Sequence, residues 1–256
     1  MANNAITILG SSSGHPKPDR ACSGYLLKAQ ESLTLLDCGG GISSSFLRRG
    51  YSSLDVARVF ISHTHPDHVS DLPLFIQLTY LDGRTDPLDL YLPSEFVGPF
   101  TAFLPAIYLI GSKLPFDLNI MGYEDGFVFK DEIKITAVGN KHLQGNGTLI
   151  SQLGLPNKMQ CHSFDIEIAG KSVFYSSDIA SLDEILPRLR GKDVAVIEST
   201  HIDIERLLGL AGDLNVGRFV ISHLGTPDEV AMINEMATKA GVDNLVTALD
   251  GMEIEL

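Results

Sequence analysis

Apolar residues in this chain fall mostly into short runs that are typical of buried β-strands. Runs such as Val59-Phe60-Ile61 contain β-branched and aromatic residues and end at polar or glycine-containing turns. The pattern predicts strands at Ile6–Leu9, Tyr25–Lys28, Leu33–Asp37, Val59–Ser62, Leu88–Leu92, Ile133–Val138, Phe164–Ile168, Ser172–Ser176, Val194–Glu198, Phe219–Ser222 and Leu245–Ala248.

Helical patterns lie between these strands. They predict helices at Ser43–Arg49, Val69–Tyr80, Leu182–Leu189, Ile204–Ala211 and Pro227–Ala240. Thr226 is a suitable N-cap for the last helix, with Pro227 at its first position. Strands come as an early meander, then a helix-rich middle, then a second strand-rich half. This order predicts an α/β fold, a four-layer αβ/βα sandwich, with residues 1–256 forming a single domain.

Residues 94–130 are harder to interpret, because they are apolar but interrupted by prolines at positions 99, 105 and 115. One interpretation is a pair of short helices that bury ordinary core surface. The other is a cap over the active site or a face for homodimer formation, since large apolar patches mark contacts. Both remain open.

The composition is that of a globular protein. With 256 residues and 44% hydrophobic content the chain can bury a full core, and no apolar run approaches the ~20 residues of a membrane span. The N-terminal residues lack a signal-peptide pattern. Cys22, Cys38 and Cys161 are odd in number and widely spaced, which favours reduced thiols in a cytoplasmic protein over a disulfide framework.

The net charge indicates which kind of substrate the protein can bind. Lys and Arg total 19 against 32 acidic residues, which gives a formal charge of −13. A protein that binds a long polyanion normally carries a basic surface that neutralises phosphates. The sequence therefore favours a small-molecule substrate over a nucleic acid.

The segment S-H-T-H-P-D-H carries the densest group of potential metal ligands. It contains His63, His65, Asp67 and His68, and three of the chain's eight histidines fall within it. Imidazole and carboxylate donors suit divalent ions such as zinc. A loop between a strand and a helix can turn His63 and His65 to one side and Asp67 and His68 to the other. We therefore expect two adjacent metal ions.

The His-x-His-x-Asp-His pattern is also the signature of the metallo-β-lactamase superfamily, which this chain resembles from end to end. The other segments that carry the resemblance are I-T-I-L-G-S-S-S-G (6–14), L-L-D-C-G-G-G (35–41), Y-S-S-D (175–178) and I-S-H-L-G (221–225). Within the superfamily the chain looks most like the phosphodiesterase branch, which includes RNase Z and the cyclic-phosphate phosphodiesterases. Because this fold hosts many chemistries, the resemblance is weaker for the substrate.

The resemblance implies a dinuclear site with zinc as the expected metal and manganese or iron as alternatives. One ion would be bound by His63, His65 and His142, the other by Asp67, His68 and His223, with Asp178 bridging them. His142 is expected to end the strand segment I-K-I-T-A-V-G-N-K-H and matches the family's third histidine, so it is preferred over its competitor His162. Asp37 resembles a buried aspartate that hydrogen-bonds the histidine loop. Asp67 and His201 are assigned catalytic roles.

The segment V-I-E-S-T-H (196–201) departs from RNase Z. Ile197 stands where RNase Z has a histidine that helps to protonate the leaving oxygen, and only 35 residues separate His142 from Asp178, too few for a long tRNA-binding arm. With the acidic charge, these departures disfavour tRNA processing. His201 is then either a general acid or a surface histidine that caps the next helix.

The sequence thus predicts a dinuclear metal-dependent hydrolase, a phosphodiesterase acting on small or cyclic phosphate diesters. The alternatives are a hydrolase of another ester class (lactone, aryl sulfate or thioester), an RNase Z-type tRNA 3′ endonuclease, or a non-hydrolytic metal-binding sensor or partner protein.

Overall fold

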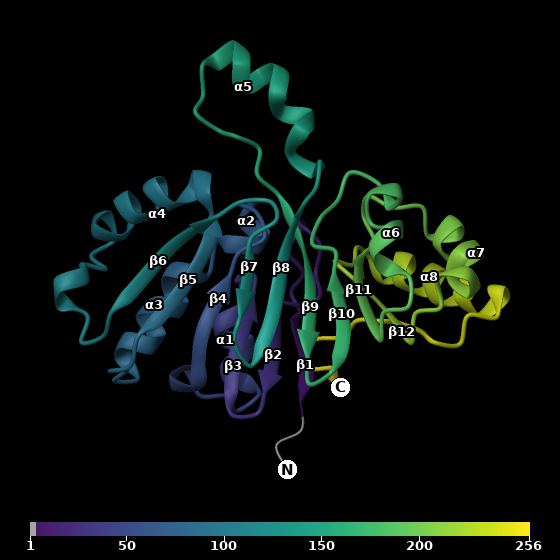
Figure 1. The fold of residues 1–256 in the computed structure, drawn as a ribbon, viewed down its shortest axis with the longest axis horizontal. Helices are drawn as coiled ribbons and strands as arrows, with labels where there is room; N and C mark the ends of the chain where they lie inside the picture. The colour runs from purple at the N-terminus through teal and green to yellow at the C-terminus, as the bar shows by residue number, and fades with distance from the viewer. Residues whose placement is uncertain (1–3) are drawn as a thin grey trace. The chain divides into compact units, whose positions relative to one another are not determined.

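The computed structural model describes residues 4–256, which divide into two compact units. Unit 1 runs to Glu124 and includes Leu249–Leu256, and unit 2 is Asp125–Ala248. Each unit is built on one seven-stranded sheet (Figure 1). No helix within residues 4–256 has the length and apolar character that a membrane span requires. The expectation of one domain over residues 1–256 stays a prediction.

The sheet of unit 1 is mixed. Its strands lie in the order β14 (Glu253–Glu255), β1 (Ala5–Gly10), β2 (Gly24–Ala29), β3 (Ser32–Leu36), β4 (Val56–Phe60), β5 (Leu88–Pro93) and β6 (Leu118–Tyr123). The pairs from β14 to β3 are antiparallel, and those from β3 to β6 are parallel. Parallel strands need crossover connections, so helical segments connect the strands from β3 to β6.

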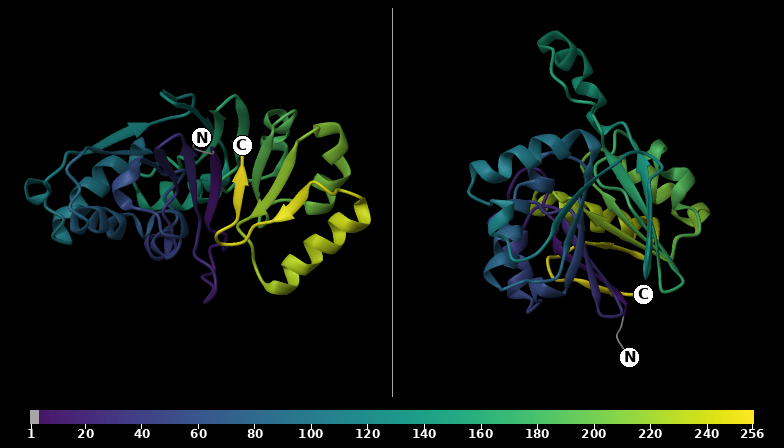
Figure 2. Two further views of the ribbon diagram at one scale, coloured as in Figure 1. Left: turned by 90° about the horizontal axis from the view of Figure 1, so that it is seen from below. Right: turned by 60° about the vertical axis from the view of Figure 1, so that its left-hand side comes forward.

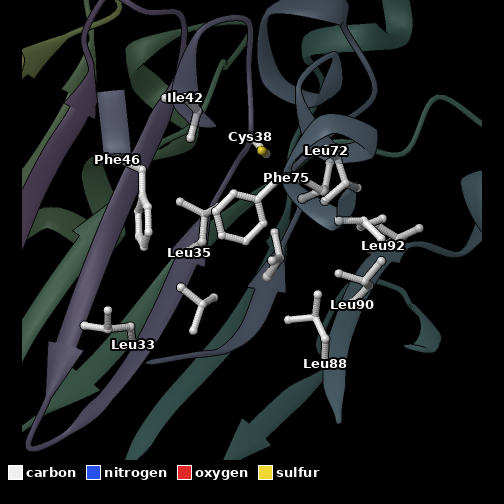
Figure 3. Close-up of a cluster of buried hydrophobic side chains, with 14 of the residues drawn as sticks. Leu33, Leu35, Cys38, Ile42, Phe46, Leu72, Phe75, Leu88, Leu90 and Leu92 are labelled. Atoms are coloured by element: carbon white, nitrogen blue, oxygen red, sulfur yellow. The ribbon is translucent and has the colours of Figure 1, made fainter. Parts of the chain in front are cut away.

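Helices of unit 1 bury one face of its sheet. They are α1 (Ile42–Arg48), α2 (Pro66–Val69), α3 (Leu72–Leu81) and α4 (Ser94–Ala106), with 3₁₀ turns η1 (Ser53–Asp55) and η2 (Gly111–Lys113). Figure 3 shows the core between sheet and helices, where Phe46 of α1 meets Phe75 of α3 edge to face, with ring centroids 5.5 Å apart. Leucines of β3 and β5 fill the same core.

The sheet of unit 2 has the same mixed design. Its order is β13 (Leu245–Thr247), β12 (Arg218–Ser222), β11 (Val194–Glu198), β10 (Lys171–Tyr175), β9 (His162–Ile168), β8 (Ile133–Gly139) and β7 (Val128–Lys130). The pairs from β13 to β10 are parallel and the rest antiparallel. The helical segments are η3 (His142–Asn146), α5 (Gly147–Leu153), η4 (Leu182–Glu184), α6 (Leu186–Leu189), α7 (Ile204–Leu214) and α8 (Pro227–Ala240). Figure 2 shows α8 alongside the sheet, where it packs on β13.

The start of α8 confirms its prediction from the sequence. The Thr226 hydroxyl accepts a hydrogen bond from the Glu229 N–H, and the Glu229 carboxylate accepts one from the Thr226 N–H. This reciprocal capping satisfies two N–H groups that the helix itself leaves unpaired.

Two predicted helices are wrong in their extent. The helix expected at Val69–Tyr80 is two helices, α2 and α3, with a break at Ser70 and Asp71. The break has a cause, because the buried Asp71 carboxylate accepts the N–H of Ser43 and its own N–H donates to Cys38. The helix expected at Leu182–Leu189 is η4 followed by α6, where Pro187 cannot donate a hydrogen bond to the preceding turn.

Residues 94–130 are not a pair of short helices, and their alternative role as a cap or a homodimer face stays a prediction. They form one helix, α4, then η2 and the strands β6 and β7, and these two strands were not predicted. Phe100 and Leu104 face the core, whereas Phe103 and Tyr108 are exposed. The sequence analysis also did not predict α5 and β14. α5 belongs to a helical excursion that projects from the ends of β8 and β9 (Figure 1), although no long arm was expected there.

The carboxylate of Asp193 joins the starts of β10 and β11. It accepts hydrogen bonds from the N–H and hydroxyl of Ser172, both at 2.8 Å, and lies 3.0 Å from the Lys171 ammonium. These donors, the Ser172 N–H first, lower the pKa of Asp193 to about 2. Since an unfolded aspartate titrates near about 3.9, the stabilisation is present above that pH and is lost as the pH falls through about 2.

We therefore expect Asp193→Asn to lower the free energy of unfolding at pH 7 by about 1 kcal/mol, a value reduced because the carboxylate is partly exposed. Urea unfolding at several pH values should show this difference shrinking between about pH 4 and pH 2. A difference that is the same at pH 7 and pH 2 would contradict the role of the charge.

Candidate metal centre

The histidine loop of unit 1 connects β4 to α2. His63 and His68 are buried, and their rings lie 4.1 Å apart between centroids, with the ring of His65 4.9 Å from that of His63. Pro66 occupies the first turn of α2, so the helix begins immediately after His65. Strand and helix therefore fix the loop at both ends, and its four donors gather in one place.

Asp37 is hydrogen-bonded to this loop. It directly follows β3 and is fully buried; its carboxylate accepts hydrogen bonds from the Ser62 N–H at 2.7 Å and the Ser62 hydroxyl at 2.8 Å. The same carboxylate lies 2.8 Å from Nδ1 of His68. A carboxylate on Nδ1 fixes the tautomer so that Nε2 presents its lone pair to a metal. The predicted supporting role of Asp37 is confirmed.

Asp67 and His68 are spaced as two ligands of one ion. The Oδ2 atom of Asp67 is 3.5 Å from Nε2 of His68. Two ligands at about 2.0–2.2 Å from a tetrahedral metal lie roughly 3.3–3.6 Å apart. The pair in unit 1 matches this spacing.

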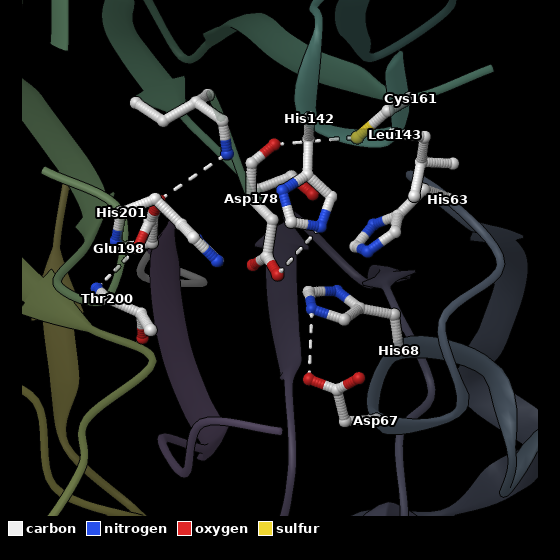
Figure 4. A network of polar contacts seen from close by, with 12 residues as sticks. His63, Asp67, His68, His142, Leu143, Cys161, Asp178, Glu198, Thr200 and His201 are labelled. Carbon is white, nitrogen blue, oxygen red and sulfur yellow. Dashed lines mark hydrogen bonds and ion pairs between the residues drawn. The ribbon is translucent and has the colours of Figure 1, made fainter. Parts of the chain in front are cut away.

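In unit 2 the carboxylate of Asp178 faces two histidines. Its Oδ2 atom is 3.6 Å from Nε2 of His142, and its Oδ1 atom is 3.5 Å from Nε2 of His223. Asp178 is buried and follows β10, and Figure 4 shows its carboxylate turned toward the His142 ring. Each oxygen thus forms a separate ligand pair with its own histidine.

His142 and His162 differ in their surroundings. His142 does not end a strand as expected, because β8 stops at Gly139 and His142 begins η3. His162 is the first residue of β9 and pairs with Gly139 across the sheet. His142 faces Asp178, so the geometry favours it over His162, and its assignment as ligand stays a prediction.

Residues at the end of β11 and just after it orient two further histidines. The Thr200 hydroxyl lies 2.9 Å from Nδ1 of His223, which turns Nε2 of that ring toward Asp178. The buried Glu198 accepts hydrogen bonds from the N–H groups of Thr200 and His201, and its Oε1 atom is 3.0 Å from Nδ1 of His201. His201 is partly exposed, and its ring lies 4.8 Å from that of His142.

The backbone is strained next to these ligands. Asp37, Ser177 and His223 have φ values of 58°, 50° and 54°. Residues with side chains rarely adopt this left-handed conformation, and where they do it is often at a functional site. Here it re-aims the chain where β3, β10 and β12 end.

The cysteines are not among the candidate metal ligands of the described residues. All three are buried, and none forms a disulfide within residues 4–256. Burial, with the nearby carboxylates of Asp71 and Asp37, raises the pKa of the Cys38 thiol well above its usual value. Because the thiolate is the metal-binding form, Cys38 acts through its backbone N–H, which donates to the carbonyl of His68.

The donor set fits a divalent ion. Unit 1 offers His63, His65, Asp67 and His68, and unit 2 offers His142, Asp178 and His223. Imidazole and carboxylate donors of this type suit zinc and neighbouring divalent metals. The sequence analysis named every one of these residues. It missed the orienting role of Ser62, Thr200 and Glu198, which only the hydrogen bonds reveal.

The two candidate histidines can be separated by metal content. We expect His142→Ala to lose bound metal, because Asp178 keeps only one of its two histidine neighbours. His162→Ala should retain the metal content of the wild type. Both proteins are measured by elemental analysis after purification without chelator, with circular dichroism as the folding control. Loss of metal in His162→Ala alone would reverse the assignment.

The chain is similar in sequence to proteins named ribonuclease Z or ribonuclease BN. A ribonuclease Z of Picrophilus torridus is 25% identical over 228 residues, which cover 76% of this chain and 73% of the relative. For several other relatives named ribonuclease Z or ribonuclease BN the match spans only 40–62% of the relative's length.

Solved structures show the fold. The metallo-β-lactamase fold protein YhfI from Bacillus subtilis aligns with a TM-score of 0.77 over 99% of both chains, at 18% identity. The short form of human tRNase Z aligns with a TM-score of 0.70 over 98% of both chains, also at 18% identity. The predicted metallo-β-lactamase fold is thereby confirmed.

Residues 4–206, well over half of the chain, match the family model described as anti-Pycsar protein Apyc1, and the protein belongs to that family.

Proposed function

We propose that this protein is a dinuclear metal-dependent phosphodiesterase that acts on small or cyclic phosphate diesters. The observation that carries the proposal is the placement of Asp178. Its two oxygens each lie at ligand-pair distance from a different histidine, which a carboxylate needs in order to bridge two ions.

In the proposed centre, one ion would be held by His63, His65 and His142, and the other by Asp67, His68 and His223. Asp178 would bridge the two ions. A bridging Asp178 would place the two ions next to each other, which is the arrangement that the sequence analysis expects. Donor chemistry favours zinc, with manganese and iron as the alternatives.

Two bound divalent ions would activate a water molecule at neutral pH and stabilise the negative charge that develops on the phosphate. The chain supplies the remaining functions. Asp37 orients the ring of His68, whose Nε2 atom already lies 3.5 Å from Oδ2 of Asp67, so this pair would need little rearrangement on binding an ion. Glu198 fixes Nδ1 of His201, which directs proton donation to Nε2. The role of His201 is then to protonate the departing oxygen.

The proposed substrate is small for reasons of charge and sequence. The chain has a formal charge of −13, whereas binding of tRNA would need a basic surface as large as the tRNA contact. Ile197 replaces the histidine that RNase Z uses for protonation. The names of the relatives favour tRNA processing instead, so an RNase Z-type activity is the second candidate.

A substrate panel tests the function directly. Protein with two equivalents of metal should hydrolyse bis-p-nitrophenyl phosphate and cyclic nucleotides, and should cleave precursor tRNA much more slowly. Lactones, aryl sulfates and thioesters serve as comparison substrates. Efficient trimming of precursor tRNA would overturn the small-substrate proposal, and a ceiling of one metal per chain after zinc addition would overturn the dinuclear one.

The role of His201 can be tested through the leaving group. Aryl leaving groups such as p-nitrophenolate depart without a proton, whereas alkoxides need one, and general acids contribute about 10²–10⁴-fold. We expect His201→Ala to slow a diester with an alkyl leaving group by roughly that factor while hardly affecting bis-p-nitrophenyl phosphate. Metal content should not change. Equal losses on both diesters would remove His201 from this role.

A further inference from the structure

A cavity of about 680 Å³ lies within unit 1, next to the histidine loop. Its walls come from the turn at residues 17–20, the end of α1, and the carboxylates of Asp67 and Asp250. A volume of this order suits a small ligand or a large part of one. The cavity therefore adjoins a proposed metal ligand.

The cavity is lined by cations from two separate elements. Lys17 and Arg20 pair across a turn with Pro18 and Asp19 at its centre, residues typical of tight turns. On the other wall Arg48 lies one helical turn beyond Ser44 on α1, with Arg49 beside it. In a chain with only 19 basic residues and a charge of −13, four of them gather here.

Arg49 is placed by the backbone of Gly251. A Cβ atom built on Gly251 would lie 2.6 Å from Cζ and Nη2 of Arg49, so a side chain there would displace the guanidinium. Gly251 also has a φ of 92°, which favours glycine. The Nε atom of Arg49 is buried and makes no hydrogen bond to any part of the chain that the structure describes.

The acidic residues in the wall have other roles. The carboxylate of Asp250 accepts hydrogen bonds from the N–H and hydroxyl of Ser11 and from the N–H of Ala21, at 2.8–3.0 Å. Asp67 is assigned to a metal. A cation at the C-terminal end of α1 also interacts favourably with the helix dipole. That effect does not explain why Lys17 and Arg20 lie on the facing wall.

We propose that this cavity binds a phosphate monoester carried by the substrate, in addition to the diester that is hydrolysed at the metals. The inference rests on the proposed function. Asp67 lines the cavity, and Gly14 leaves this side of Asp67 uncovered, since a Cβ there would lie 3.4 Å from Oδ2. Arginine guanidinium groups bind phosphate with paired hydrogen bonds. The preferred substrate is then a nucleotide diester that bears a second phosphate.

Two chromogenic substrates that differ only in the additional monoester test phosphate binding in the cavity separately from hydrolysis of the diester. The p-nitrophenyl ester of thymidine 5′-phosphate carries only the diester, and its 3′-phosphorylated form carries the additional monoester. We expect wild type to prefer the second in kcat/KM. In Arg48→Ala/Arg49→Ala the ratio of the two kcat/KM values should fall about tenfold or more, mainly through KM, because each charge-assisted hydrogen bond is worth roughly a factor of ten.

The control is Arg188→Ala/Arg218→Ala, which removes the same charge from exposed positions in unit 2. It should leave the ratio within twofold of wild type. A ratio near one in wild type, or equal falls in both double variants, would overturn the inference and leave the phosphodiesterase proposal intact.

Calorimetry makes the test independent of turnover. Metal-loaded wild type should bind thymidine 3′,5′-bisphosphate at least tenfold more tightly than thymidine 5′-phosphate, and Arg48→Ala/Arg49→Ala should abolish the difference. If neither chromogenic ester is hydrolysed, the proposed function fails. The two affinities still show whether the cavity binds the additional phosphate. If inorganic phosphate binds in an Arg48- and Arg49-dependent manner but both nucleotides bind alike, the cavity holds a free anion and the substrate role is wrong.

Discussion

The hydrogen bonds of one buried carboxylate, that of Asp37, hold the metal-binding part of unit 1 together. They reach the end of β4 through Ser62 and the start of α2 through His68. A buried carboxylate is costly unless its oxygens are satisfied, and here each oxygen has donors at 2.7–2.8 Å. The backbone adds to this, since the N–H groups of Cys38 and Ser23 donate to the carbonyls of His68 and Asp67. The ligand loop is therefore fixed by folding, before any metal binds.

Much of the fold could be predicted because its strands are short apolar runs with clear ends. The central strands β4, β5, β11 and β12 were all recognised from such runs. The sequence did not reveal β6, because this strand lies at a sheet edge and only Tyr123 of its six residues is buried. Helix boundaries failed where a tertiary contact decides them. The break before α3 depends on the Asp71 carboxylate, whose partner Ser43 is remote in sequence.

The candidate ligands were predictable because their residue types are rare and their spacing is specific. The residues that orient them were not. Thr200 and Glu198 look like ordinary residues after a strand, and only the three-dimensional structure shows that one holds His223 and the other holds His201. Backbone conformation was equally hidden, since nothing in the sequence signals that Ser177 and His223 adopt positive φ. Sequence patterns identify donors, but hydrogen bonds determine where their lone pairs point.

The position of Asp178 has a thermodynamic consequence. With one oxygen near His142 and the other near His223, a single side chain contributes to both proposed sites. If two ions bind as proposed, loading the first site would immobilise this carboxylate and remove rotamer entropy that the second site would otherwise have to lose. It would also place a positive charge nearby, which would oppose the second ion. The two affinities would then be linked, and the balance of these opposing effects would set how much half-loaded protein exists at limiting metal concentration.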